Sequence, residues 1–332
     1  MEGQIVGFDI GEKQLKMALF SGKTLRKTAV VELPDNLVRD GEIVSMDAMA
    51  DFIRQSTKEN GIPRCGASIV LPGSLVISRN VTVPYMNVKQ LEYNLPFEFN
   101  DYLSQEKAKY YFDYAVNEKI ADEDGNIEEI ELFSCAVLKE TIERYRSMFR
   151  RAGFRLRSAV PEEYAYGVLV RENGELLPGG EGVTCILDIG HRGMRMIILQ
   201  NKKIETTRTI ERGLVDLEQM IADKYDADIH RAHVYLNQNY DDVQICDEAI
   251  EIYQQMAMEI MKTINFYRYS NRDRELENMY ICGGGSRVDA LVNVIELMTD
   301  VKVKSVSAIC AQTQDREAAS ICAKAIGTGL AV

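Results

Sequence analysis

The chain has 332 residues, of which 46% are hydrophobic and 27% charged, and its 51 acidic and 39 basic side chains give a formal net charge of −12. This composition is typical of a folded globular protein and excludes a disordered chain. The acidic balance argues against a general nucleic-acid-binding protein, which needs clustered Lys and Arg. The length predicts two domains, or one larger unit with a cleft.

The cysteine pattern argues against disulfides and structural zinc. The seven cysteines form no CxxC pair and are accompanied by three histidines, which is typical of reduced thiols in a cytoplasmic protein. The first residues lack the regions of a secretory signal, and no stretch reaches the roughly 18 to 20 apolar residues that cross a bilayer. The C-terminal tail, interrupted by Lys324, predicts a packed helix and not a membrane-surface helix.

The first half of the chain alternates strand-like and helical runs. Apolar runs at 4–9, 15–20, 28–33 and 68–71 predict strands, and residues 46–60 predict a helix. The early strands are typical of the opening meander of a sheet.

A different pattern begins at residue 76. A strand is expected at 76–83 and a helical stretch after Asn87. Two runs at 109–117 and 130–137, joined by an Asp-Gly turn, predict a hairpin, and residues 139–152 predict a helix that ends at a glycine. Seven basic residues lie between Lys139 and Arg157. They form either a solvated helix face, which we prefer, or a docking surface for an acidic partner or lipid.

The middle of the chain shows an internal repeat. A linker-like, glycine-rich segment at 172–182 divides the sequence. After it, Asp188-Ile-Gly190 repeats the earlier Asp9-Ile-Gly11, each time at the end of an apolar strand and before a second one. The repeat predicts two homologous halves that face each other.

The second half is expected to be mainly helical. The pattern predicts helices at 214–225, 229–236 and 247–269, then a strand at 279–282, three glycines and a serine, and a helix at 287–298. Strands that alternate with helices predict an α/β fold.

Both Asp-Ile-Gly turns carry chemistry suited to a phosphate. A glycine after a strand lets backbone N–H groups approach an anion, and the neighbouring aspartate can hold Mg²⁺ through water. A single Asp-x-Gly turn is common in proteins and is a weak signal, so the inference depends on the presence of two copies. The strand that runs into Gly283-Gly-Gly-Ser286 can pass close to a base or ribose, and it lacks the lysine of a P-loop.

The order of these three motifs resembles the phosphate-1, phosphate-2 and adenosine motifs of the actin-like ATPase superfamily. Over residues 3–304 the chain is similar to the PilM family of type IV pilus assembly proteins, which is itself similar to FtsA. Further matching stretches lie at 81–99, 138–165 and 264–286. The resemblance implies an α/β, ribonuclease H-like fold with two duplicated lobes around a nucleotide cleft. The implied domains are 1–175, with an insertion at about 80–155, and 176–332, with a helical subdomain at about 210–278.

The resemblance also implies a set of site residues for ATP and Mg²⁺. Asp9 and Asp188 would hold Mg²⁺ through water, and Lys16 would reach the phosphates. Glu162 and Glu163, near the connection between the lobes, are the candidates for a water-activating carboxylate, although both could simply favour a helix N-terminus. The other residues carried over to the nucleotide are Gly11, Glu12, Gly190, His191, Arg192, Arg212, Gly213, Glu218, Gly283, Gly284, Gly285 and Ser286.

Two positions depart from the family pattern. Glu12 would bring a carboxylate toward the terminal phosphate, at a Coulomb cost unless it is paired, and Met194 replaces the usual threonine of phosphate-2. Arg192 or His191 could offset Glu12 or contact phosphate directly. Hydrolysis of ATP is therefore expected to be weak at most.

The implied role is that of an interaction protein. A PilM-like chain would lie on the cytoplasmic face of the inner membrane and bind the cytoplasmic N-terminal peptide of a PilN-like membrane protein, with nucleotide as a structural ligand or slow switch. The peptide groove would involve the first lobe and its insertion. Two alternatives stay open: a small-molecule kinase of the same superfamily, and an FtsA-like filament protein.

Overall fold

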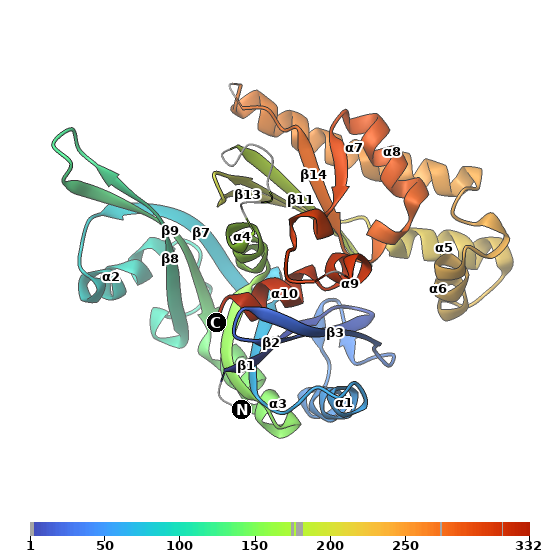
Figure 1. Ribbon diagram of the computed structural model, residues 1–332, viewed down its shortest axis with the longest axis horizontal. Coiled ribbons are helices and arrows are strands. Elements are labelled where there is room, and N and C mark those ends of the chain that lie inside the picture. The colour runs from blue at the N-terminus through green and yellow to red at the C-terminus, as the bar shows by residue number, and fades with distance from the viewer. Residues whose placement is uncertain (1–2, 174–175, 177–181, 273, 314) are drawn as a thin grey trace.

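Two five-stranded sheets form the centres of two lobes in the computed structural model, which describes residues 3–173, 176, 182–272, 274–313 and 315–332. Figure 1 shows helices α4 and α10 between the lobes and a third, smaller sheet that projects from the first lobe. Among the residues described, no helix is both long and apolar enough to span a membrane.

The first sheet has the order β10-β6-β1-β2-β3. Its strands run antiparallel from β1 to β3 and parallel from β1 through β6 to β10. The bounds are β1 Gln4–Ile10, β2 Gln14–Ser21, β3 Thr24–Glu32, β6 Gly66–Leu71 and β10 Arg155–Pro161. A short hairpin, β4 Val38–Arg39 and β5 Glu42–Ile43, lies between β3 and the first helix in the chain.

The second sheet repeats this topology in the order β13-β12-β11-β14-β15. Again the first three strands in the chain are antiparallel, and the last two lie parallel on the other side of the first. The bounds are β11 Val183–Ile189, β12 Met194–Gln200, β13 Lys203–Ile210, β14 Asn278–Cys282 and β15 Lys302–Ser305. The predicted fold class, with two duplicated lobes, is confirmed.

The third sheet, in the order β7-β9-β8, is inserted between β6 and the helix before β10. Its long hairpin and a short helix enclose a separate hydrophobic core. The helix begins with a capping box, in which Asn87 and Gln90 each bond the other's backbone N–H. The bounds are β7 Val76–Pro84, α2 Val88–Asn94, β8 Tyr110–Ala121 and β9 Ile127–Leu138.

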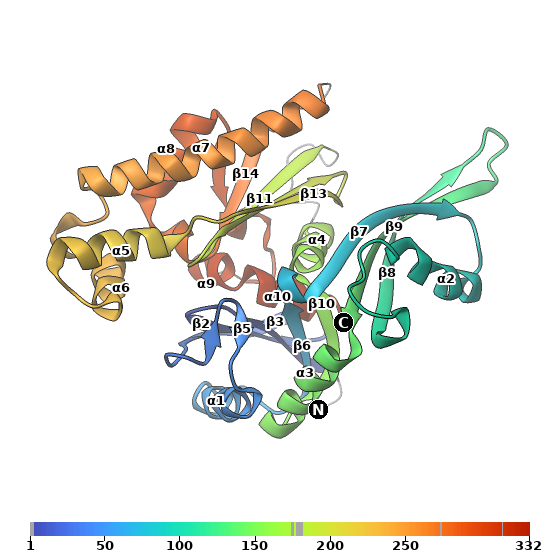
Figure 2. The ribbon, with the colours of Figure 1, turned by 180° about the vertical axis from the view of Figure 1, so that it is seen from behind.

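Helices cover the outer face of each main sheet. In the first lobe, α1 Met46–Glu59 starts at the cap Ser45 and α3 Lys139–Ala152 ends at Gly153, whose φ of 94° favours glycine. Figure 2 shows the long α7 across the outside of the second lobe. The helices of that lobe are α5 Leu214–Tyr225, α6 Ile229–Gln238, α7 Asp247–Ser270, α8 Asp289–Thr299 and α9 Arg316–Ile321.

Two helices pack between the lobes. α4 Glu162–Glu172 and α10 Ala323–Leu330 contact each other, and α10 also lies on β1 and β2. The contact is close because glycines leave room: a Cβ on Gly327 would lie 2.1 Å from the carbonyl oxygen of Ala165. The predicted packed C-terminal helix is therefore confirmed, and its burial leaves no face for lipid.

Several element predictions were incomplete. The third strand begins at Thr24 and not at residue 28, and α8 begins at Asp289 after a short 3₁₀ turn. The strands β10, β13 and β15 were not predicted, because they are short or rich in polar residues. Most of the predicted linker at 172–182, and with it the predicted domain boundary at 175/176, lies outside the described residues.

Candidate functional site

The two Asp-Ile-Gly turns meet across the cleft between the lobes. Asp9 lies near the end of β1 and Asp188 near the end of β11. The ammonium nitrogen of Lys324, from the first turn of α10, lies 3.7 Å from Oδ1 of Asp9 and 3.1 Å from Oδ2 of Asp188. A single cation of the chain therefore bridges the two aspartates that the sequence assigned to Mg²⁺.

Lysines dominate the electrostatics of these aspartates. Burial alone would raise the pKa of Asp188, but Lys324 and Lys16 outweigh burial and lower it. Burial likewise opposes the charge of Lys324, yet Asp188, Asp9 and Glu162 raise its pKa well above the usual value. Nζ of Lys16 lies 3.4 Å from Oδ2 of Asp9. Lys16 thus contacts an aspartate of the cleft in this structure.

The two candidate catalytic carboxylates open α4 and contact Arg195 of the second lobe. The guanidinium lies 3.5 Å from an oxygen of Glu162 and 3.5 Å from one of Glu163. Glu162 also accepts a hydrogen bond from the backbone N–H of Gly73 at 3.0 Å, and Lys324 lies 3.3 Å from its second oxygen. Burial raises the pKa of Glu163. Both oxygens of Glu162 therefore have partners, whereas Oε2 of Glu163 is buried without a hydrogen bond among the described residues. The catalytic role of the two carboxylates stays a prediction.

The phosphate-2 turn carries an arginine that pairs across the mouth of the cleft. Nε of Arg192 lies 3.1 Å from Oε1 of Glu12, and the guanidinium also pairs with Asp40. The second oxygen of Glu12 accepts from the backbone N–H of Gly41 at 3.0 Å. Arg192 thus offsets Glu12, as one of the sequence alternatives proposed.

Behind this turn, a buried glutamate lies between two histidines. His191 Nε2 lies 3.0 Å from one oxygen of Glu218, and His233 Nδ1 lies 2.7 Å from the other. Burial opposes the charge of Glu218, but the two histidines outweigh it and lower its pKa to about 2. Both oxygens of Glu218 are thus engaged by protein.

The glycine-rich turn after β14 packs against the phosphate-2 strand. Gly283 has φ of 83°, and a Cβ there would lie 2.3 Å from Oδ1 of Asp188, so only glycine fits. A Cβ on Gly285 would lie 2.2 Å from Ile189. The hydroxyl of Ser286 donates to the carbonyl of Gly283 at 2.7 Å, which closes the turn.

A cavity of about 280 Å³ lies in the cleft, and it is lined by only part of the predicted set. Arg212 pairs with Asp216 at 3.6 Å, and Gly213 packs against the backbone of His191. Neither lines the cavity, nor do Asp9, Glu163, Glu218, Gly283, Gly285 and Ser286. The predicted residues that do line it are Gly11, Glu12, Lys16, Glu162, Asp188, Gly190, His191, Arg192 and Gly284.

The donor set in the cleft does not fit a Mg²⁺ ion. Magnesium needs carboxylates that are free to bind its water shell. Here the ammonium of Lys324 contacts both Asp9 and Asp188, and Lys16 contacts Asp9 from the other side. The predicted metal role of the two aspartates therefore conflicts with the arrangement of these side chains. Gly11, Gly190 and Gly284 line the cavity. The N–H of Gly11 donates to the carbonyl of Gln14 and that of Gly190 to the carbonyl of Gly193, at 2.9 Å in each case, so these two donors are engaged within their turns.

Sequence reasoning missed Lys324, Arg195 and His233 as cleft residues. Lys324 had a signal, because it is the single charge in a tail of small and apolar residues, where an unpaired lysine would be costly. Arg195 and His233 lie in a strand and a helix without any motif. Their place in the cleft depends on tertiary packing.

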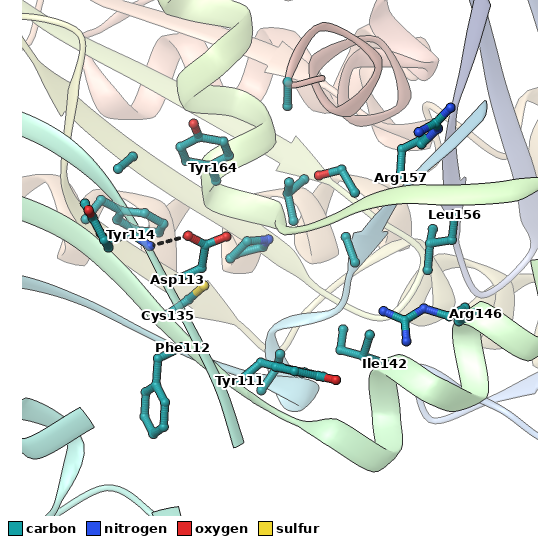
Figure 3. A pocket seen from close by; sticks show the side chains of 18 residues that line it. Tyr111, Phe112, Asp113, Tyr114, Cys135, Ile142, Arg146, Leu156, Arg157 and Tyr164 are labelled. Atoms are coloured by element: carbon teal, nitrogen blue, oxygen red, sulfur yellow. Dashed lines mark hydrogen bonds between the residues drawn. The ribbon is translucent and has the colours of Figure 1, made fainter. Parts of the chain in front are cut away.

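A second concavity lies between the first lobe and its insertion. Figure 3 shows this groove, of about 420 Å³, between strands β8 and β10, with α3 and α4 beside it. Residues 111–115 of β8 all border the groove. Phe112 and Tyr114 also pack on the core of the insertion, so the alternate residues Tyr111, Asp113 and Ala115 lie on the opposite face of the strand. Its remaining wall includes Cys135, Ile142, Arg146, Leu156, Arg157 and Tyr164.

Both flanking strands present an unpaired edge to this groove. Among the described strands, β8 pairs with β9 alone and β10 with β6 alone. Free N–H and C=O groups on such an edge are suited to an added strand. The groove thus combines partly apolar walls with two edges that can bond a peptide backbone.

The family model for the type IV pilus assembly protein PilM matches residues 7–329. The chain belongs to the PilM family. This membership favours a role in pilus assembly over a small-molecule kinase or an FtsA-like filament. No curated protein sequence matches the chain.

Solved structures show the same fold. The PilM-family chain resembles the structure titled "PilM-PilN type IV pilus biogenesis complex" with a TM-score of 0.80 and 20% identity, covering 98% of each chain. The ethanolamine utilization protein EutJ from Carboxydothermus hydrogenoformans matches with a TM-score of 0.60 and 12% identity, over 98% of this chain and 89% of that one. Ta0583, an archaeal actin homolog, matches with a TM-score of 0.51 and 11% identity over 98% of each chain. The fold is thus actin-like.

Proposed function

We propose that this PilM-family chain is a pilus assembly component that binds the cytoplasmic N-terminal peptide of a PilN-like inner-membrane protein in the groove between β8 and β10. The observation that carries the proposal is the pair of unpaired strand edges around a groove of about 420 Å³. The similar solved complex is titled as one of PilM with PilN, which supports a partner of this kind.

The groove favours an extended segment over a helix. A strand inserted beside β8 or β10 satisfies its own backbone groups and those of the edge. Its alternate side chains would contact the face made by Tyr111, Ala115 and Cys135, which is partly apolar. Arg157 is exposed and Asp113 lies on the facing strand, so charged groups of either sign on the peptide have a partner at the rim.

This interpretation gives the basic segment between residues 139 and 157 a mixed role. Arg151 pairs with Asp47 and Asp51, at 3.2 Å in each case, and so links α3 to α1 within the first lobe. Arg146 and Arg157 line the groove. Part of the segment is therefore a solvated helix face, and part borders the proposed peptide site.

ATP as a structural ligand or slow switch stays a prediction for the interlobe cleft. The cavity of about 280 Å³ is slightly smaller than the range of about 300 to 1,000 Å³ for ligand sites. The ion pair between Arg192 and Glu12 also closes its mouth. We infer that nucleotide entry would require the lobes to separate and this ion pair to break.

The proposed location follows from the partner. A chain that binds a cytoplasmic peptide of an inner-membrane protein is held at the cytoplasmic face of that membrane by its partner. Self-association and contacts with other pilus components stay predictions.

Binding of the partner's N-terminal peptide, labelled with a fluorophore, tests the proposal by anisotropy. We expect saturable binding without nucleotide, since the groove and the cleft are lined by different residues. A peptide with the same composition in scrambled order is the control. No saturable binding, either with or without ATP, would refute the proposed function.

A further inference from the structure

Lys324 is the only charged residue of α10, and its side chain is 16% exposed. The rest of this helix consists of small and apolar residues, most of them buried between the lobes. A lysine in such a helix is costly unless carboxylates pair with it. The carboxylates that contact its ammonium group therefore show which charge interactions α10 brings to the cleft.

Carboxylates from three elements converge on this ammonium group. Asp9 comes from β1, Asp188 from β11 and Glu162 from the start of α4. Nζ of Lys324 lies 3.7, 3.1 and 3.3 Å from their respective oxygens. Because these elements belong to both lobes, the lysine joins the lobes at the centre of the cleft.

Three cations of the chain already surround the carboxylates at this point. Lys324 contacts Asp9, Asp188 and Glu162, and Lys16 contacts Asp9 at 3.4 Å. Arg195 lies 3.5 Å from Glu162 and is shared with Glu163, also at 3.5 Å. Magnesium bound through water between Asp9 and Asp188 would have to share its position with the ammonium group. Two cations in contact repel each other, and burial in a region of low dielectric strengthens the repulsion.

We propose that Lys324 takes the place of a divalent cation in this cleft and holds the two lobes together through Asp9 and Asp188. Because Lys324 is a residue of the chain itself, the contact forms whenever α10 packs between the lobes. Lobe closure is then independent of Mg²⁺. A nucleotide that enters the cleft would meet the lysine and not a metal between these aspartates.

The test measures the melting temperature of the chain in EDTA, Mg²⁺ and Mn²⁺, each with and without ATP. We expect the wild-type melting temperature in Mg²⁺ to equal that in EDTA within about 1 °C, because no divalent site adds to folding. Lys324→Met keeps an unbranched side chain but removes the charge. It should lower the melting temperature by more than about 5 °C, and Mg²⁺ or Mn²⁺ should restore part of the loss.

Mn²⁺ binding gives a second readout. Electron paramagnetic resonance should detect one Mn²⁺ site in Lys324→Met that the wild type lacks. The matched control is Lys262→Met, which removes an exposed lysine that pairs with Glu259 at 2.7 Å. We expect no new Mn²⁺ site and little change in melting temperature for this control.

Three results would overturn the proposal. One is a wild-type melting temperature that rises with Mg²⁺ by more than about 3 °C, and another is a Mn²⁺ site in the wild type. The third is a Lys324→Met variant as stable as the wild type in EDTA. If Lys324→Met does not fold, Lys324→Met/Asp188→Asn removes one negative charge together with the lysine. This double variant should fold and should bind Mn²⁺ only weakly, because it keeps one of the two aspartates. If neither variant folds, the wild type still decides: a melting temperature that rises with Mg²⁺ by more than about 3 °C overturns the proposal, and an unchanged one supports it.

Discussion

Nε of Arg192, on the second lobe, lies 3.1 Å from Oε1 of Glu12, on the first. This ion pair crosses the mouth of the cleft at the point where the two phosphate-type turns face each other. It explains how a carboxylate is tolerated beside a predicted phosphate site, because the guanidinium neutralises it. The ion pair also holds the two turns together through side chains of the protein.

Removal of this arginine should loosen the mouth of the cleft. Arg192 is half exposed, so we expect Arg192→Ala to lower the free energy of unfolding by less than about 1 kcal/mol. Amide hydrogen exchange at residues 11–14 and near Gly41 should nevertheless accelerate, since Glu12 loses its partner. Arg272→Ala, at an exposed arginine over Tyr269, is the control. Unchanged exchange in the Arg192 variant would contradict this role.

The histidines around Glu218 should make stability depend on pH. The bond to Glu218 raises the pKa of His233 above 6.5, a contribution that is present below this value and is lost as pH rises through the raised pKa. The lowered pKa of Glu218, about 2, stabilises the fold above about pH 4.5, and the contribution is lost as pH falls toward 2. The cluster should therefore contribute most between about pH 4.5 and 6.5.

Urea unfolding of His233→Gln measures this contribution. We expect the variant to be less stable than the wild type by about 1 to 3 kcal/mol at about pH 6, and the difference to shrink at about pH 9. His230→Gln, at an exposed histidine 3.2 Å from Asp35, should show a small difference at both values. A His233→Gln difference that grows with pH would be inconsistent with the assigned pKa direction.

Gly213 should tolerate no side chain. A Cβ there would lie 2.4 Å from the carbonyl oxygen of His191 and 2.7 Å from the nitrogen of Gly193, both backbone atoms. We expect Gly213→Ala to lower the free energy of unfolding by about 1 to 3 kcal/mol or more. At Gly284 the nearest atom, Cδ1 of Leu214, is 3.4 Å away, so Gly284→Ala is the control. Equal melting temperatures for the two variants would contradict the close packing at Gly213.

Peptide binding should protect the backbone of at least one edge of the groove. If the peptide adds a strand, amide exchange should slow at residues 111–115 of β8 or 156–160 of β10. Strands β2 and β12, inside their sheets, serve as internal references. Protection confined to the interlobe cleft would place the peptide elsewhere.

The parts of the fold that were predictable from sequence have local signals. The bounds of α3 and α5 follow from the periodicity of their apolar residues and from the residues that flank each helix. The repeated Asp-Ile-Gly turn indicated the duplicated lobes. β13 was missed because its sequence, KIETTRTI, is mostly polar. Its strand conformation depends on pairing with β12.

The candidate site was predictable only where its residues lie in motifs. Gly11, Asp188 and Gly190 were placed in the cleft by their turns, and they line the cavity. Lys324 lies far from them in sequence and reaches Asp9 and Asp188 only because α10 packs between the lobes. Charge pairs of this kind depend on tertiary structure, which a single sequence does not specify locally.

The affinity of the partner's N-terminal peptide for two neighbouring tryptophan variants tests the central claim most directly. Ala115 faces the groove, whereas Val116, the next residue of β8, points to the other face and is 50% exposed. We expect Ala115→Trp to fill the groove and weaken binding by more than about tenfold, and Val116→Trp to change it by less than about twofold. Equal affinity of both variants and the wild type would contradict a peptide site in this groove.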